Sequence, residues 1–165
     1  MQASLVFVSD TNIWIDFDKA GLLHTLFALP FHYCTTDFAA EELAQPDGKT
    51  LIEHGLRVMP LEAAALLRVE VLTRKYAKPS FTDLTCLVLA EEIGCKLLTG
   101  DQALRKAAEN EDNVVVHGAL WLLDQMIEHK ILSLKKASAS LQKMLECGAR
   151  LPQAACDERL KRWEG

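Results

Sequence analysis

Residues 80–109 read SFTDLTCLVLAEEIGCKLLTGDQALRKAAE and contain a helix, a strand and a second helix in close succession. The apolar run 80–93 follows helical spacing, begins with a serine typical of a helix N-cap and ends before a glycine typical of a helix C-terminus. The short run 95–99 (CKLLT) indicates a buried strand. A Gly-Asp turn then leads into a helix over 102–109. This order predicts one unit of a parallel sheet that is covered by helices.

The same alternation of strands and helices extends outward from this segment. Short apolar or β-branched runs predict strands at residues 5–8, 32–35, 56–59, 95–99 and 114–116. Helical spacing predicts helices at residues 13–17, 22–29, 38–44, 61–76, 80–93, 102–109 and 119–131. Right-handed crossover connections place helices on both faces of a parallel sheet. We therefore expect an α/β fold, a three-layer α/β/α sandwich with a central parallel five-stranded sheet.

The 165 residues and their 50% hydrophobic content suit a single globular domain. We expect a catalytic domain over residues 1–131 and a basic helical C-terminal extension of the same domain over 132–165. The five cysteines form no C-x-x-C pair, which favours reduced thiols and a cytoplasmic location. No uncharged apolar run approaches the roughly 18 residues that a membrane helix needs, so we expect no membrane association.

The net charge of −5 at first argues against a nucleic-acid partner, but the charge is unevenly distributed. Residues 1–128 hold 10 basic and 19 acidic side chains, a balance of −9, whereas residues 129–165 hold 8 basic and 4 acidic side chains, a balance of +4. The acidity therefore belongs to the segment with the predicted sheet.

Four of these acidic positions fall at one edge of the predicted sheet, outside the carboxyl ends of the strands, where functional sites of such folds lie. Asp10 follows a strand directly, and Asp101 follows one after a short turn. Asp83 lies in the first turn of a predicted helix, and Glu41 or Glu42 lies one turn into another. Taken singly, each is explained as a helix cap, a first-turn acid or a solvated side chain. Together they are costly, because two unit charges about 4 Å apart repel by roughly 4 kcal/mol at an effective dielectric of about 20. A hard divalent cation, Mg²⁺ or Mn²⁺, would offset that repulsion.

Four segments together resemble the PIN-domain family of metal-dependent ribonucleases, which includes VapC-type toxins of bacterial toxin–antitoxin pairs. They are VSDTNIWIDF, TTDFAAEEL, the quoted segment 80–109 and VVVHGALWLLDQM, and they span about residues 4–131. The resemblance implies a PIN-like sandwich and an enzyme that hydrolyses RNA phosphodiester bonds with Mg²⁺ or Mn²⁺. It also implies 3′-hydroxyl and 5′-phosphate product ends, a possible antitoxin partner and a homodimer.

Carried over by position, the resemblance implies that the catalytic and metal-binding residues are Asp10, Glu42, Asp83 and Asp101. Asn12 and Thr99 match positions at which the family often places polar residues that orient the metal site. Glu42 is preferred to Glu41 because it directly precedes Leu43; a one-residue offset on a helix rotates a side chain by about 100°.

Basic residues beside the acidic positions are candidates for contact with RNA. Arg74, Lys75 and Lys78 precede Asp83, and Arg105 follows Asp101. These four cations are predicted to bind phosphates that flank the cut, although solvated helix ends explain them equally well.

Two other functions compete with the ribonuclease. A PIN-like domain could bind RNA or a protein without catalysis, which a metal titration would reveal. A phosphoryl-transfer protein also clusters acidic residues at strand ends, but Asp10 lacks a second Asp two residues on, and no Lys follows the last strand. The five histidines have no metal-site spacing, and no nucleotide-binding glycine motif is present.

Overall fold

The computed structural model describes residues 5–164, which form alternating strands and helices. Residues 1–4, at the start of the predicted catalytic domain, and Gly165, at the end of the predicted C-terminal extension, lie outside the described residues. The strands are β1 (Leu5–Ser9), β2 (Phe31–Thr36), β3 (Arg57–Met59), β4 (Lys96–Leu98) and β5 (Val116–His117). The helices are α1 (Thr11–Lys19), α2 (Leu23–Ala28), α3 (Asp37–Glu42), α4 (Gly48–His54), α5 (Ala63–Lys75), α6 (Phe81–Ile93), α7 (Gln102–Glu111), α8 (Ala119–Glu128), α9 (Leu134–Glu146) and α10 (Gln153–Glu164).

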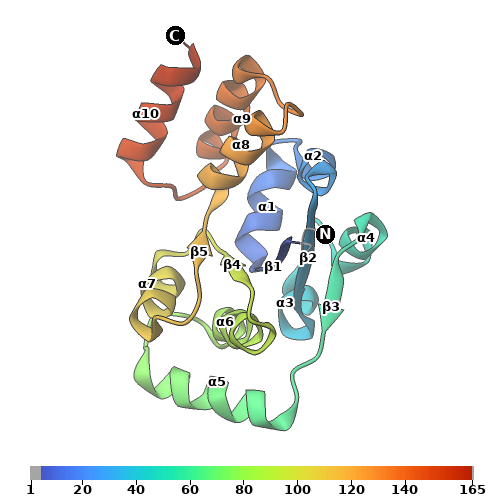
Figure 1. Cartoon of the computed structure of the whole chain (residues 1–165), viewed down its shortest axis with the longest axis vertical. Coiled ribbons are helices and arrows are strands. Elements are labelled where there is room, and N and C mark those ends of the chain that lie inside the picture. The colour runs from blue at the N-terminus through green and yellow to red at the C-terminus, as the bar shows by residue number, and fades with distance from the viewer. Residues whose placement is uncertain (1–4, 165) are drawn as a thin grey trace.

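The strands form one five-stranded sheet in the order β3-β2-β1-β4-β5, and every pairing is parallel. The central strand β1 pairs with β2 through Phe7 opposite Tyr33 and with β4 through Val8 opposite Leu97. The strands end at a common edge, so the loops that follow β1, β2 and β4 lie together (Figure 1). The expected parallel five-stranded sheet is confirmed.

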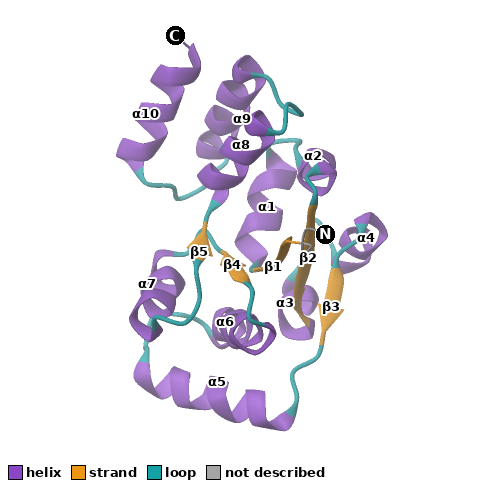
Figure 2. Ribbon diagram, in the orientation of Figure 1, coloured by secondary structure: helices purple, strands orange, loops and turns teal. Residues whose placement is uncertain are grey.

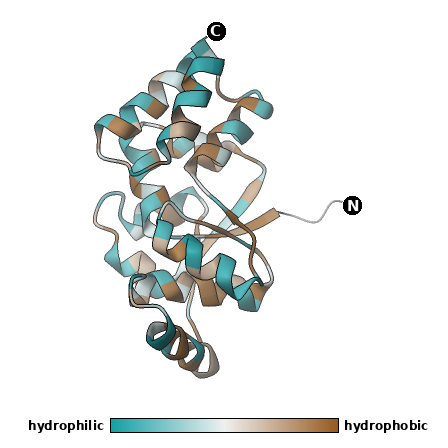
Figure 3. Ribbon diagram, turned by 90° about the vertical axis from the view of Figure 1, so that its left-hand side faces the viewer, coloured by the Kyte–Doolittle hydropathy of each residue, from teal (hydrophilic) through white to brown (hydrophobic). Residues whose placement is uncertain are grey.

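Successive residues of β1 bury their side chains in different hydrophobic clusters, because side chains alternate across a strand. Phe7 belongs to a cluster with residues of α1, α2, α8 and α9, whereas Val8 belongs to a cluster with residues of α5, α6 and α7. The helices therefore form one layer on each side of the sheet (Figure 2). The strands between them are mostly hydrophobic and the outer helices mixed (Figure 3). The expected three-layer α/β/α sandwich is confirmed.

Three local features differ from the expectations. Helix α4 was not predicted; Asp47 caps its start, and Gly55 ends it with φ of 122°. Strand β5 begins at Val116 rather than 114, and Val115 is exposed at this edge of the sheet. Helix α8 ends at Glu128 rather than at 131, because Lys130 has a left-handed backbone with φ of 61°.

The C-terminal segment is more deeply buried than its polar composition indicates. Helix α9 places Leu141 and Met144 in the same hydrophobic cluster as Phe7, and α10 adds Cys156 and Trp163. Helix α9 packs on α1 and α8, and α10 packs on α9 (Figure 1). Within residues 5–164, no helix is both long and apolar enough to cross a membrane.

Candidate active site

Asp10 occupies the centre of the acidic edge, between strand β1 and helix α1. Its side chain is 1% exposed. As the N-cap of α1, Asp10 accepts a hydrogen bond at Oδ1 from the backbone N–H of Ile13 at 3.2 Å. Its Oδ2 accepts a second hydrogen bond from the hydroxyl of Thr99, at the end of β4. The strand end and the cap together hold this carboxylate in one orientation.

Thr99 links Asp10 to Asp101. The Oγ1 atom of Thr99 donates to Asp10 and accepts a hydrogen bond from the backbone N–H of Asp101 at 3.0 Å. Asp101 in turn caps helix α7, since its Oδ1 accepts from the backbone N–H of Ala103 at 2.8 Å. Two of the predicted acids and the predicted supporting threonine therefore form one hydrogen-bonded unit.

Asp83 and Glu42 meet at the start of helix α6. Ser80 and Asp83 form a reciprocal capping box, in which the backbone N–H of Ser80 donates to Asp83 Oδ2 at 3.2 Å. Glu42, at the end of α3, accepts a hydrogen bond from the Thr82 hydroxyl at 2.6 Å. This contact brings Glu42 to the residue next to Asp83, whereas the structure records no such bond for Glu41 within residues 5–164.

The electrostatics of the cluster disfavour uncompensated negative charge. Burial raises the pKa of the Asp10 carboxyl to about 7, and the charges of Asp83 and Asp101 act in the same direction. Burial is also the main cause of the raised pKa of Asp83, to which Asp101 contributes. The chain therefore retains acidic groups here despite an unfavourable free energy of ionisation, which is common at functional sites.

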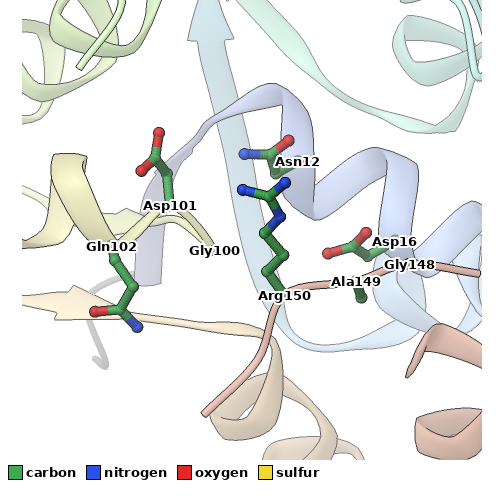
Figure 4. Close-up of a pocket in the computed structure, with 8 residues that line it drawn as sticks. All are labelled: Asn12, Asp16, Gly100, Asp101, Gln102, Gly148, Ala149 and Arg150. Carbon is green, nitrogen blue, oxygen red and sulfur yellow. The ribbon is translucent and has the colours of Figure 1, made fainter. Parts of the chain in front are cut away.

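A cavity of about 450 Å³ opens beside this cluster. It is lined by Asn12, Asp16, Gly100, Asp101, Gln102, Gly148, Ala149 and Arg150. Figure 4 shows the guanidinium of Arg150 directed toward Asn12, between Asp16 and Asp101. The predicted supporting residue Asn12 thus borders the cavity.

Two charged residues that line this cavity, Asp16 and Arg150, were not predicted from the sequence. Asp16 follows Asn12 by four residues on α1, a spacing that puts both on one helix face and could have revealed it. Burial raises the pKa of Asp16 as well. Arg150 comes from the loop between α9 and α10, so no local sequence signal placed it beside the acidic edge.

Two of the four predicted phosphate contacts form ion pairs with acidic side chains. Lys75 forms an ion pair with Glu111 at 2.8 Å, and Arg74 forms one with Glu70 at 2.9 Å. Glu111 ends α7, whose ten residues extend about 15 Å from the Asp101 end. Lys78 and Lys75 line the same surface hollow, whose other wall is formed by residues of α7 such as Lys106.

Arg105, the fourth predicted phosphate contact, lies close to the carboxyl edge of the sheet. An ideal Cβ atom added to Gly118 would be 2.9 Å from Arg105 Nη2 and 3.3 Å from the Thr99 carbonyl oxygen. The Arg105 guanidinium therefore reaches the junction of β5 and α8, next to the end of β4.

The donor chemistry of the cluster fits a hard divalent cation. Within residues 5–164, no three His, Cys, Asp or Glu side chains are already arranged as the ligands of one ion. The acidic groups are nevertheless all oxygen donors, and the buried Asp10 carboxylate is destabilised by two neighbouring acids. A Mg²⁺ or Mn²⁺ ion held by Asp10 and Asp101 would remove that unfavourable charge.

Comparisons with known proteins agree with this fold. A family model described as a PIN domain matches residues 6–165. Among solved structures, a similar protein is a PilT N-terminus domain protein from the hyperthermophilic archaeon Sulfolobus solfataricus P2. The two share 13% identity with a TM-score of 0.53, over 76% of this chain and 96% of that chain. At this identity the likeness concerns the fold alone. A search of curated proteins found no match.

Proposed function

This chain belongs to the PIN-domain family, and we propose that it is an endoribonuclease that hydrolyses RNA phosphodiester bonds with Mg²⁺ or Mn²⁺. PIN domains are typically nucleases and generally use divalent metal ions. The observation that carries the proposal is the buried Asp10 carboxylate, hydrogen-bonded to Thr99 and destabilised by Asp83 and Asp101 at the carboxyl edge of the sheet.

The proposed roles follow from the contacts of each residue. Asp10 and Asp101 would hold the ion, and Thr99 fixes their relative position through its two hydrogen bonds. A divalent ion in such a site lowers the pKa of water and offsets the charge of the scissile phosphate. Asp83 and Glu42, joined through the first turn of α6, would orient the attacking water or help to hold a second ion.

The test is cleavage of single-stranded RNA labelled at either end. We expect the purified protein to cut the RNA internally in the presence of Mn²⁺ or Mg²⁺ and to leave 3′-hydroxyl and 5′-phosphate ends. Excess EDTA should abolish cleavage, and added Mn²⁺ should restore it. Cleavage that persists unchanged after exhaustive chelation, in protein shown by elemental analysis to be free of metal, would contradict the proposal.

The adjacent acids on α3 provide a matched pair of variants. Glu42→Gln is expected to lower kcat/KM by about 10- to 100-fold, since outer groups of metal sites contribute effects of this size. Glu41→Gln removes the same charge one position away and should leave kcat/KM within about twofold. Steady-state kinetics with one RNA substrate measures both. The reverse order of effects would assign the role to Glu41.

We further propose that the protein acts in the cytoplasm as a homodimer and that it is the toxin of a toxin–antitoxin pair. The exposed apolar side chains of Leu67 and Val71, on the outer face of α5, support an interface between two copies.

The toxin role rests on the family resemblance, and co-purification with a small DNA-binding protein encoded by an adjacent gene would support it.

A further inference from the structure

A second cavity, of about 520 Å³, adjoins the acidic site on the side of β5. It lies between the loop after β4, the start of α8 and the α9–α10 loop. Its lining consists of Thr99, Gly100, Gln102, Arg105, Val116, His117, Gly118, Ala119, Leu120, Trp121, Arg150, Leu151, Pro152, Ala155 and Arg159. We call it the arginine cavity. Its volume is within the range of small-ligand sites, about 300–1,000 Å³.

The charge of the arginine cavity is opposite to that of the acidic site. Three arginines line it, and none of its lining residues is acidic. Arg159 is paired with Asp124 at 2.7 Å. In the described part of the chain, Arg105 and Arg150 have no ion pair and no side-chain hydrogen bond, so their guanidinium groups remain available to an anion. Planar guanidinium groups suit phosphate oxygens.

The start of helix α8 adds to this positive potential. Its N-cap is Gly118, which has no side chain to bond the first backbone N–H groups of the helix. These groups and the helix dipole favour an anion at the same end. The Arg105 guanidinium reaches this same point, as the close approach at Gly118 shows.

The cavity also offers an aromatic surface. The rings of His117 and Trp121 stack at 3.9 Å between centroids with an interplanar angle of 9°, and both residues line the cavity. Burial, together with the charges of Lys96 and Arg105, lowers the pKa of His117, which favours the neutral imidazole at pH 7. A neutral aromatic ring beside guanidinium groups is an arrangement on which nucleic-acid bases stack.

The two cavities share lining residues. Both the 450 Å³ cavity beside the acidic residues and the arginine cavity are bordered by Gly100, Gln102 and Arg150. An RNA strand whose scissile phosphate is held near the carboxylates by a divalent ion therefore has a direct continuation toward Arg105 and Arg150. The α9–α10 loop, which supplies Arg150, forms one wall of this passage.

We propose that the arginine cavity binds the nucleotide of the RNA strand adjoining the scissile phosphate. Arg105 and Arg150 hold its phosphate, and its base packs on the His117 ring, since Trp121 is already stacked between His117 and Phe31. The proposal rests on the proposed RNA-cleaving function for its choice of ligand. It gives the C-terminal segment a role in substrate binding, because Arg150 belongs to that segment and would contact the RNA.

The test measures RNA binding without catalysis. Fluorescence anisotropy with a labelled single-stranded RNA dodecamer in EDTA gives Kd for the wild type, Arg105→Gln, Arg150→Gln and a control. The control is Lys135→Gln, which removes the same charge from the far end of α9, whose thirteen residues extend about 20 Å. We expect each arginine variant to raise Kd about tenfold and the control to change it less than twofold. The slope of log Kd against log salt should fall by about 0.7 for each phosphate that the variant no longer binds.

The outcomes separate this inference from the proposed function. Arginine variants that bind RNA like the Lys135→Gln control would overturn the subsite, even if the wild type cleaves RNA normally. Weakened binding by both arginine variants supports the subsite, whether or not the wild type cleaves RNA under any metal condition. Unchanged melting temperatures of the variants would show that the folded protein was compared throughout.

Discussion

Asp10→Asn is expected to reduce kcat/KM for Mn²⁺-dependent RNA cleavage by about 10³-fold or more, and Asp83→Asn and Asp101→Asn are expected to reduce it severely. A metal centre supplies several kcal/mol of charge stabilisation, and each 1.36 kcal/mol corresponds to a factor of ten in rate. Asparagine keeps the size of the side chain and an oxygen for the Ile13 N–H, but it lacks the anionic charge that a divalent cation requires. Initial rates with a labelled single-stranded RNA measure the effect.

The control for this series is Asp47→Asn. Asp47 caps α4 through a hydrogen bond from the Thr50 N–H at 2.8 Å, so it performs the same capping role as Asp10 on an exposed helix. Asparagine caps helices as well as aspartate does. Asp47→Asn should therefore retain wild-type activity. Mn²⁺-dependent cleavage that survives both Asp10→Asn and Asp83→Asn would refute a metal site at these carboxylates.

In metal-free buffer at pH 8, Asp10→Asn is expected to raise the melting temperature by about 5 °C. An Asp carboxyl ordinarily titrates near 3.8, whereas burial raises the pKa of Asp10 to about 7. Between these two values the folded state keeps a proton that the unfolded state releases. Raising the pH through this window therefore destabilises the folded protein, by up to about 4 kcal/mol, and the loss is complete above pH 7.

The neutral amide of the Asp10→Asn variant avoids that loss at pH 8, but its NH₂ group cannot accept the hydrogen bond from Thr99, which offsets about 2 kcal/mol of the gain. For a chain of this size, the remaining gain of about 2 kcal/mol corresponds to roughly 4–8 °C. Mn²⁺ at a hundred times its Kd should stabilise the wild type by about 2.7 kcal/mol and should leave Asp10→Asn unchanged. Differential scanning calorimetry with and without Mn²⁺ measures both effects. Asp47→Asn should respond to Mn²⁺ like the wild type. A destabilised Asp10→Asn protein that Mn²⁺ still stabilises would mean that Asp10 serves only as a helix cap.

Most of the fold was predictable, because the hydrophobic pattern of each segment indicates the same helix or strand that a parallel sheet with crossover helices requires at that place. The apolar run 80–93, the strand after it and the Gly-Asp turn predicted α6, β4 and the start of α7 close to their observed positions. Helix α4 was missed because it is short and buries only Leu51 among its residues. Its hydrophobic periodicity is correspondingly weak, and tertiary contacts rather than pattern maintain it.

Asp10, Asp83 and Asp101 lie at the element ends where the sequence pattern placed them, whereas Glu42 is the last residue of α3 rather than one turn into a longer helix. Asp10 and Asp101 are linked through Thr99, and Glu42 reaches the first turn of α6 beside Asp83. Their roles in metal binding stay predictions. The ion pair of the predicted cation Lys75 with Glu111 could not be read from the sequence, because it depends on the packing of α5 against α7. Arg74, by contrast, pairs with Glu70 four residues earlier on α5, a spacing that the sequence itself shows.

The sequence by itself determined the alternation of strands and helices and, through it, the common edge of the acidic residues. Hydrophobic periodicity is local, and parallel strands must all end on one side of their sheet. Only the tertiary structure decided that Arg150, 140 residues after Asp10 in the chain, stands at the same site. Its position depends on the packing of α9 against α1 and α8 and of α10 against α9, through buried residues such as Leu141 and Trp163. Such long-range contacts leave no periodic signal in a polar, basic segment.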